Sequence, residues 1–269
     1  MRKSLAVFAV ALLAFCFARV ERSAAQTGGD VLNPTESIGF LLGPVGGINA
    51  VAYNSSAFPI IESEKDCFTA QNGSDIAPWV GFTFEFPLSA AMQNFIIGEV
   101  IYDSKSSKFT ALNGSKLTTA TKQNGYEAPG SVATALTSSL DYLLIDLAFK
   151  YNFTEGPSPV GPGIQIGPSV GIKTTSNFNK TVTVTASNGT GDGVTASQTV
   201  SAQSPIDGAQ AIRLALRAQA TYDIPFTQTW IMTPTVGYDL PITKVDATRE
   251  WHASSVYAGV AFRYFLKGF

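Results

Sequence analysis

A histidine and a serine near the C-terminal end of the chain have the spacing of a nucleophile and its base. His252 and Ser254 are two residues apart, so on a β-strand their side chains would share one face. Serine is activated when a base lies within hydrogen-bond reach and a third group orients that base. Glu250 is near enough in sequence to be the third group. If the three side chains touch, they could hydrolyse an ester.

A second candidate is the glycine-rich segment Gly189–Gly193, which could be a phosphate-binding or calcium-binding loop. It lacks the Lys-Ser/Thr pair of a P-loop and the ligand spacing of a calcium site. Alternating threonine and valine precede it in Thr181–Thr185. The segment Val194–Val200, which follows it, also contains valine and threonine, residues that favour strands. We therefore expect Thr181–Val200 to be a hairpin that prolongs the fifth and sixth strands, with an exposed rim able to pair with a partner strand. No cofactor is expected.

The segment Ile212–Ile224 shows which elements could position such groups. Apolar residues occupy every second position for thirteen residues, and between them lie Arg213, Arg217 and Asp223. This is the period of a β-strand whose two faces meet different environments. Strands of soluble proteins average about 5–6 residues, whereas a strand that crosses an outer membrane needs about 9–11. The pattern favours a membrane strand with lipid on one face and a polar lumen on the other.

Similar segments recur along the chain and predict an all-β fold, an eight-stranded antiparallel up-and-down transmembrane β-barrel. The connections between the strands alternate between long and short, as in outer-membrane barrels with long external loops and short periplasmic turns. Both termini are therefore expected in the periplasm. Ser104–Thr137 and Thr174–Ala211 are expected to be long loops. The expected strands are Ile38–Tyr53, Trp79–Phe86, Phe95–Asp103, Leu140–Phe153, Ile164–Lys173, Ile212–Ile224, Trp230–Leu240 and Val256–Tyr264.

Two residue types refine this prediction. Trp79, Trp230 and Trp251 all lie near predicted strand ends, which matches the aromatic girdles at the two rims of such barrels. Three prolines, Pro44, Pro168 and Pro234, fall inside predicted strands. Since proline cannot donate a hydrogen bond to a neighbouring strand, we expect bulges or missing bonds at these positions.

Composition and the N-terminus agree with an exported membrane protein. A basic start, an apolar run at Leu5–Ala18 and small residues before Gln26 predict a signal peptide at 1–25. A periplasmic segment at 26–37 and the barrel domain at 38–269 follow. Charged residues are 14% of the chain, against about 25% in typical soluble domains. Removing the signal peptide changes the formal charge from −2 to −5, which gives no reason to expect nucleic acid as a partner.

The alternation also predicts which charged side chains point into the lumen. Eight strands leave an interior only wide enough for side chains to fill, and an isolated charge there would be strongly unfavourable. We therefore expect five acids and five bases to pair and close the lumen. They are Glu85, Glu99, Asp146, Asp223 and Asp239, with Lys150, Lys173, Arg213, Arg217 and Arg263.

The order and spacing of these segments resemble the small porin-like outer-membrane β-barrel family of Bacteroidetes-type bacteria, which is similar to the OmpA transmembrane barrel. Leu140–Phe153, Gly167–Gly171 and Phe262–Tyr264 carry the resemblance, which covers nearly all of Ile38–Phe265. It implies a location and an architecture, and no particular activity. Members of the family often stop at the aromatic residue that Tyr264 replaces, so either Tyr264 or Phe269 could be the signal for the barrel-assembly machinery.

The sequence leaves three functions open. The first is a non-enzymatic monomeric barrel, embedded in outer-membrane lipid, whose external loops bind an unknown ligand or protein. The second is a narrow porin for small solutes. The third is a lipid A hydrolase, because His252-Ala253-Ser254 resembles the His-x-Ser pair of outer-membrane lipid A deacylases, although the flanking residues differ.

Overall fold

The computed structural model describes the chain from residue 39 to residue 266, except for five short internal segments and five single or paired positions. Within these residues, no helix is long and apolar enough to cross a membrane. The proposed signal peptide and the periplasmic segment lie outside the described residues. So do the tip of the predicted hairpin and Phe269, one of the two candidate assembly signals. The described ranges are 39–55, 58–59, 69–88, 92–111, 117–123, 126–154, 160–187, 195–206, 208–227, 229–247 and 250–266.

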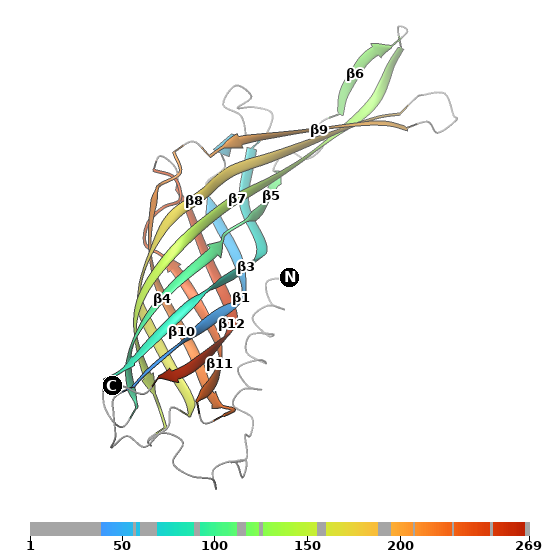
Figure 1. The fold of residues 1–269 in the computed structure, drawn as a ribbon. Coiled ribbons are helices and arrows are strands. Elements are labelled where there is room, and N and C mark those ends of the chain that lie inside the picture. Colours follow the sequence, from blue (N-terminus) through green and yellow to red (C-terminus); the bar gives the residue numbers. More distant parts are fainter. Residues whose placement is uncertain are drawn as a thin grey trace.

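Eight long strands form a closed ring, in which each strand is antiparallel to both neighbours (Figure 1). The last strand pairs with the first, so the ring has no free edge at the level of the barrel. This confirms the predicted eight-stranded antiparallel barrel, although most strands are longer than predicted. The ring consists of β1 (Phe40–Ser55), β3 (Thr69–Pro87), β4 (Asn94–Ser104), β7 (Tyr126–Asn152), β8 (Gly161–Ser187), β10 (Ile212–Pro225), β11 (Trp230–Pro241) and β12 (Trp251–Leu266).

The two faces of each barrel strand have opposite chemistry. On β7, Ile145, Leu147 and Phe149 point outward and are 42–59% exposed, whereas Asp146 and Lys150 point inward and are buried. Exposed apolar side chains over a whole surface are unfavourable in water and suit lipid. The alternation seen in the sequence is thus the alternation between a lipid-facing outside and a filled inside.

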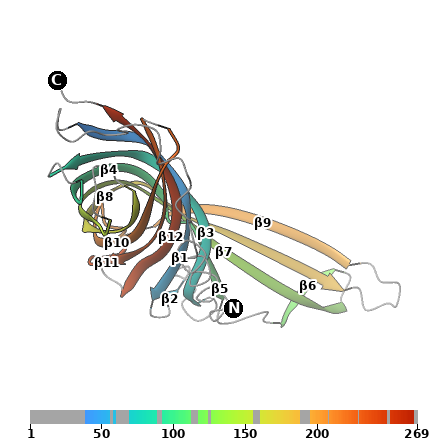
Figure 2. The same cartoon turned by 90° about the horizontal axis from the view of Figure 1, so that it is seen from below.

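Two strands of the ring continue beyond the barrel and form a projecting sheet with one further strand. We call this sheet the arm. The arm consists of the outer halves of β7 and β8 with β9 (Thr195–Pro205), and it leans away from the barrel axis (Figures 1 and 2). The predicted hairpin is confirmed by the β8–β9 pairing, from Asn177 opposite Pro205 to Ser187 opposite Thr195. It prolongs the fifth barrel strand, β8, as predicted. The predicted prolongation of the sixth strand was wrong, because the chain leaves β9 at Pro205 and starts β10 only at Ile212.

The segment Ser104–Thr137, predicted to be a loop, is largely strand. It contains β5 (Ser107–Ala111), which pairs with β3 and β7, and β6 (Leu117–Gln123), which pairs with β7. A further two-residue strand, β2 (Phe58–Pro59), pairs with β3. The prediction was wrong because strands outside the membrane need no apolar face, so their polar sequence resembles that of a loop.

The three strand prolines interrupt the hydrogen-bonded ladder without bulges. Pro44 is paired with Phe82 on one side, but the β1–β12 pairing skips Gly43 and Pro44 and then resumes in the same register. Pro168 and Pro234 show the same one-sided gap, toward β7 and β10 respectively. Hydrogen bonds are therefore missing at the three prolines, as expected, and the register on both sides of each gap is unchanged.

The barrel has two unlike ends, which we call the inner and the outer end. The short connections β3–β4, β7–β8 and β10–β11 lie at the inner end, together with the start of β1 and the end of β12 (Figure 1). The arm lies at the outer end. The inner end corresponds to the predicted periplasmic side.

Candidate functional site

The lumen is filled by side chains, and the structure brings most of the predicted charged residues together there. Nine of the ten are buried. Lys173 is the exception: it lies half-buried at the outer rim, where its Nζ donates to the Ala209 carbonyl oxygen at 2.8 Å. The buried charges form three layers along the barrel axis.

The inner layer contains two carboxylates and two bases that bond to one another. Lys150 Nζ lies 2.7 Å from Asp223 Oδ2 and 3.4 Å from Glu85 Oε2. Arg263 bridges the same two carboxylates, with Nη2 at 2.5 Å from Asp223 Oδ1 and Nη1 paired with Glu85. Thr233 Oγ1 also donates to Asp223 Oδ1, at 2.8 Å. The layer is neutral and, with Thr233, ties five barrel strands together.

The outer layer contains two residues that the sequence analysis missed, Asp103 and Lys105. Lys105 Nζ lies 2.8 Å from Asp103 Oδ2 and 3.0 Å from Asp239 Oδ2. Arg213 Nη2 lies 2.8 Å from Asp239 Oδ1. The inward alternation of β4 continues without a break through Asp103, Lys105 and Ser107. The signal was therefore present in the sequence, but the strand was predicted to stop at Asp103.

The middle layer has more acid than base. Arg217 pairs with Asp146 and lies 4.0 Å from Glu99 Oε2, and its guanidinium carbon lies 4.3 Å from the centre of the Tyr257 ring. With two carboxylates and one base, this layer differs from its neighbours. The expectation of equal numbers of acids and bases was wrong, because the three layers contain six carboxylates and five bases. Compared with the predicted set, Asp103 and Lys105 are added and Lys173 is absent.

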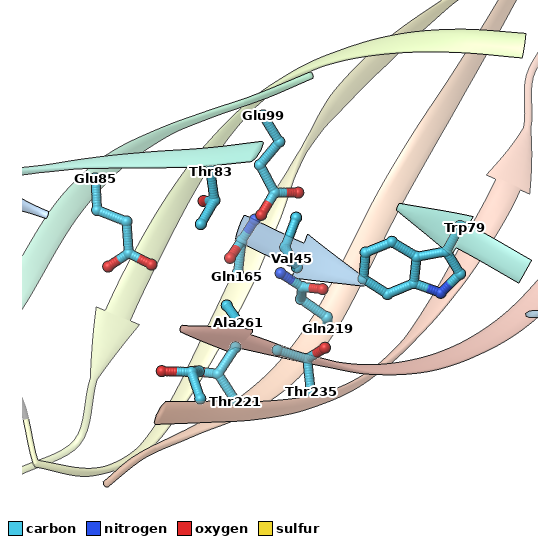
Figure 3. Close-up of a pocket in the computed structure, with 11 residues that line it drawn as sticks. Val45, Trp79, Thr83, Glu85, Glu99, Gln165, Gln219, Thr221, Thr235 and Ala261 are labelled. Atoms are coloured by element: carbon cyan, nitrogen blue, oxygen red, sulfur yellow. The ribbon is translucent and has the colours of Figure 1, made fainter. Parts of the chain in front are cut away.

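A small polar cavity lies beside the middle layer, with a volume of about 10 Å³. A cavity of about this size holds one water molecule. Thr83, Glu85 and Glu99 line one side, and Thr221 and Thr235 line the other (Figure 3).

Apolar side chains seal both ends of the lumen. At the outer end, Trp251 is fully buried and stacks on Phe178, with ring centres 5.8 Å apart. Tyr53 and Phe109 lie against the same indole at 5.4 and 5.9 Å, and we call these four rings the aromatic cap. The inner end is closed by an apolar plug made of Leu41, Met92, Phe95, Ile97, Ala148, Ile231 and Phe265.

The prediction that all three tryptophans form rim girdles was wrong for two of them. Trp79 is buried in the lumen, because β3 begins at Thr69 and places it in mid-strand on the inward face. Trp251 is buried in the aromatic cap. Trp230 is 36% exposed at the inner rim and packs against Tyr264 at 5.2 Å, as a girdle residue would.

The candidate hydrolytic residues are not arranged as a nucleophile and its base. Ser254 Oγ donates to the Ala52 carbonyl oxygen at 3.3 Å. His252 Nε2 lies 3.7 Å from Glu250 Oε2, and Lys244 also bonds to Glu250. The hydrogen bond from Lys244 lowers the pKa of the exposed Glu250 carboxyl. A carboxylate thus lies beside His252, as a catalytic arrangement would need. The hydroxyl of Ser254, however, bonds to the backbone of β1.

The closed antiparallel ring and its apolar belt agree with the sequence comparison. The outer membrane protein beta-barrel domain family matches residues 24–247. The chain belongs to this family. Its members are β-barrels of the outer membrane, so the belt of exposed apolar side chains faces outer-membrane lipid. No curated protein sequence matches the chain significantly.

Solved structures that are similar to this outer membrane protein beta-barrel include three small bacterial barrels. The attachment invasion locus protein Ail of Yersinia pestis is 8% identical, with a TM-score of 0.32 over 83% of this chain and 98% of Ail. OprG of Pseudomonas aeruginosa is 10% identical, with a TM-score of 0.35 over 86% of this chain and 98% of OprG. Neisserial surface protein A is 12% identical, with a TM-score of 0.33 over 84% and 96% of the two chains.

Because three charged layers and two apolar seals fill the lumen, we predict that the protein conducts no ions. In a planar lipid bilayer, we expect no stable single-channel steps from the wild type. Arg217→Ala should also be silent, because the aromatic cap and the apolar plug remain on either side of the middle layer. Bilayers that then respond to an added pore-forming peptide provide the control. Frequent, uniform steps from the wild type would contradict the closed lumen and support a narrow porin.

Proposed function

We propose that this protein is a non-enzymatic outer-membrane barrel that binds an extended segment of another protein along the free edge of its arm. The observation that carries the proposal is the position of β9. It pairs with β8 over its whole length, and among the described residues no strand pairs with its other side. A free edge presents a row of unpaired N–H and C=O groups, to which an added strand can bond.

The sequence of β9 supports this role, because it lacks the features that normally protect an edge. Natural sheets block exposed edges with charged side chains, proline or bulges. Thr195–Ser204 contains no charged residue and no proline, and the one proline of β9, Pro205, is its last residue. The β8–β9 register has no shift. The edge is also uncovered, since the side chains from Ser201 to Pro205 are exposed. An unprotected edge of this length would be a liability unless a partner uses it.

The other two functions have less support. A narrow porin needs a continuous passage, whereas the lumen is filled by three charged layers between two apolar seals. A lipid A hydrolase needs Ser254 beside His252, whereas Ser254 bonds to the Ala52 carbonyl oxygen. Export by the segment 1–25, insertion as a monomer by the barrel-assembly machinery, and a periplasmic inner end complete the proposal.

Neighbouring proline substitutions on β9 can test the edge directly. Along an antiparallel edge strand, the N–H and C=O groups of successive residues point alternately to the paired strand and to solvent. Ser201→Pro and Ala202→Pro each remove one backbone N–H group. At one of the two positions this N–H donates a hydrogen bond to β8, and at the other it points to the free edge. Peptides selected from a random phage-displayed library on cells that carry the wild type serve as the probe. We expect the variant that keeps the β8–β9 bonds to lose peptide binding by at least about tenfold.

Amide hydrogen exchange at Thr181–Thr185 identifies which of the two variants keeps the β8–β9 bonds. Ser201→Ala and Ala202→Ser are the matched controls, because they change the side chains at the same two positions and retain both backbone N–H groups, so both should bind as the wild type does. Unchanged binding in the ladder-preserving variant would exclude the free edge as the binding surface. Selected peptides that bind equally well to a protein without Thr195–Pro205 would do so as well.

A further inference from the structure

The middle layer carries a negative charge that its own base does not balance. Arg217 is bonded to Asp146, and its Nη1 lies 4.0 Å from Glu99 Oε2, the outer limit of an ion pair. Glu99 is 8% exposed and Asp146 is 6% exposed. An uncompensated carboxylate in a water-poor interior is strongly unfavourable, so a proton or a cation must neutralise it.

The cavity beside this layer is lined by polar side chains, and at least one of their oxygen atoms has no hydrogen-bond partner among the described residues. Thr221 Oγ1 lines it, is buried, and has no hydrogen-bond partner among the described residues. Thr83, Thr235 and the side chains of Gln165 and Gln219 point into the same space as Glu99 (Figure 3). Carboxylate, hydroxyl and amide oxygens together are the ligand set of a hard cation.

We propose that the cavity holds one small monovalent cation of the size of Na⁺, bound by Glu99 and Thr221. A single charge matches the one unbalanced carboxylate of the middle layer. The volume of about 10 Å³ leaves room for a guest no larger than about one water molecule. The site should therefore prefer Na⁺ to K⁺ and exclude Cs⁺.

Unfolding in different salts tests this assignment. The protein is refolded in detergent in NaCl, CsCl or choline chloride at equal ionic strength, so the cation can enter before the lumen closes, and is then titrated with urea. A cation that binds only the folded state lowers the unfolding equilibrium constant by the factor 1 + [cation]/Kd. We expect a lowering of about tenfold in Na⁺ at ten times Kd, which saturates a single site, and no difference between Cs⁺ and choline.

Two variants link the effect to the cavity. Glu99→Gln removes the unbalanced charge with little change of shape, so it should be as stable in Na⁺ as in choline. Thr221→Val removes one ligand and should weaken the Na⁺ dependence while retaining Glu99, which keeps the test informative if Glu99→Gln does not fold. Asp75→Asn removes a carboxylate from a partly exposed ion pair with Lys108 and should leave the dependence intact.

Three outcomes would overturn the proposal. Equal midpoints for the wild type in Na⁺ and choline would mean that no cation is bound. A stability difference that persists in Glu99→Gln would place the effect elsewhere. Midpoints that respond to pH but not to the choice of cation would mean that a proton neutralises the layer instead.

Discussion

Replacing Asp223 by asparagine should lower the free energy of unfolding by about 3–5 kcal/mol, the usual cost of removing one partner from a buried ion pair. Asp223 is fully buried and accepts bonds from Lys150, Arg263, Asn152 and Thr233. Its neutral replacement leaves Lys150 and Arg263 with Glu85 as their only remaining carboxylate. The inner layer would then carry one positive charge that nothing balances. Urea unfolding of the refolded protein in detergent measures the change.

The matched comparison is Asp75→Asn on the outside of the outer end. Asp75 pairs with Lys108 at 3.4 Å, and the lysine side chain is 71% exposed. Water and salt screen such a pair, so its loss should change the stability by less than about 1 kcal/mol. If the two substitutions have similar effects, the inner layer is hydrated and the lumen is not the dry, filled interior described above.

Replacing Trp251 by alanine should cost about 3–5 kcal/mol, as is usual when a large buried aromatic side chain is truncated. Its indole is fully buried and contacts the rings of Tyr53, Phe109 and Phe178, which come from three other strands. These rings cannot all move in to fill the space, because each is attached to a different hydrogen-bonded strand. Urea unfolding monitored by circular dichroism measures the loss.

Trp230→Ala is the control for this substitution. Trp230 is of the same residue type but lies on the outside of the barrel, where detergent or lipid can occupy the vacated space. Its loss should therefore cost clearly less than the loss of Trp251. An equal cost for both would indicate that the aromatic cap is open to solvent rather than packed.

The barrel itself could be predicted from the sequence because its two environments differ so strongly. Lipid outside and charges inside force an alternation that is visible in every long segment, as in Ile145–Lys150 and Ile212–Ile224. The same alternation gave the inward position of nine of the ten predicted charged residues. Pairing between strands then follows, because each inward charge needs a partner across the lumen.

The arm was harder to predict, for a physical reason. Above the membrane both faces of a strand meet water, so the two-residue period of hydrophobicity disappears although the strand continues. This hid the outer half of β7. Lys105 was missed for a different reason, because the alternation continues to it but β4 was predicted to stop at Asp103. Trp79 and Trp251 were misplaced because a strand end cannot be located where its pattern fades.

The position of β12 after all other barrel strands in the chain has a consequence for biogenesis. This one strand sends a side chain into each level of the lumen: Trp251 into the aromatic cap, Ser255 to Lys105 at 2.6 Å, Tyr257 to Arg217, and Arg263 to the inner layer. It is also the last of the barrel strands in chain order. A nascent barrel that lacks β12 must therefore keep its interior charges hydrated, and the pairing of β12 with β1 expels that water and completes all levels in one step.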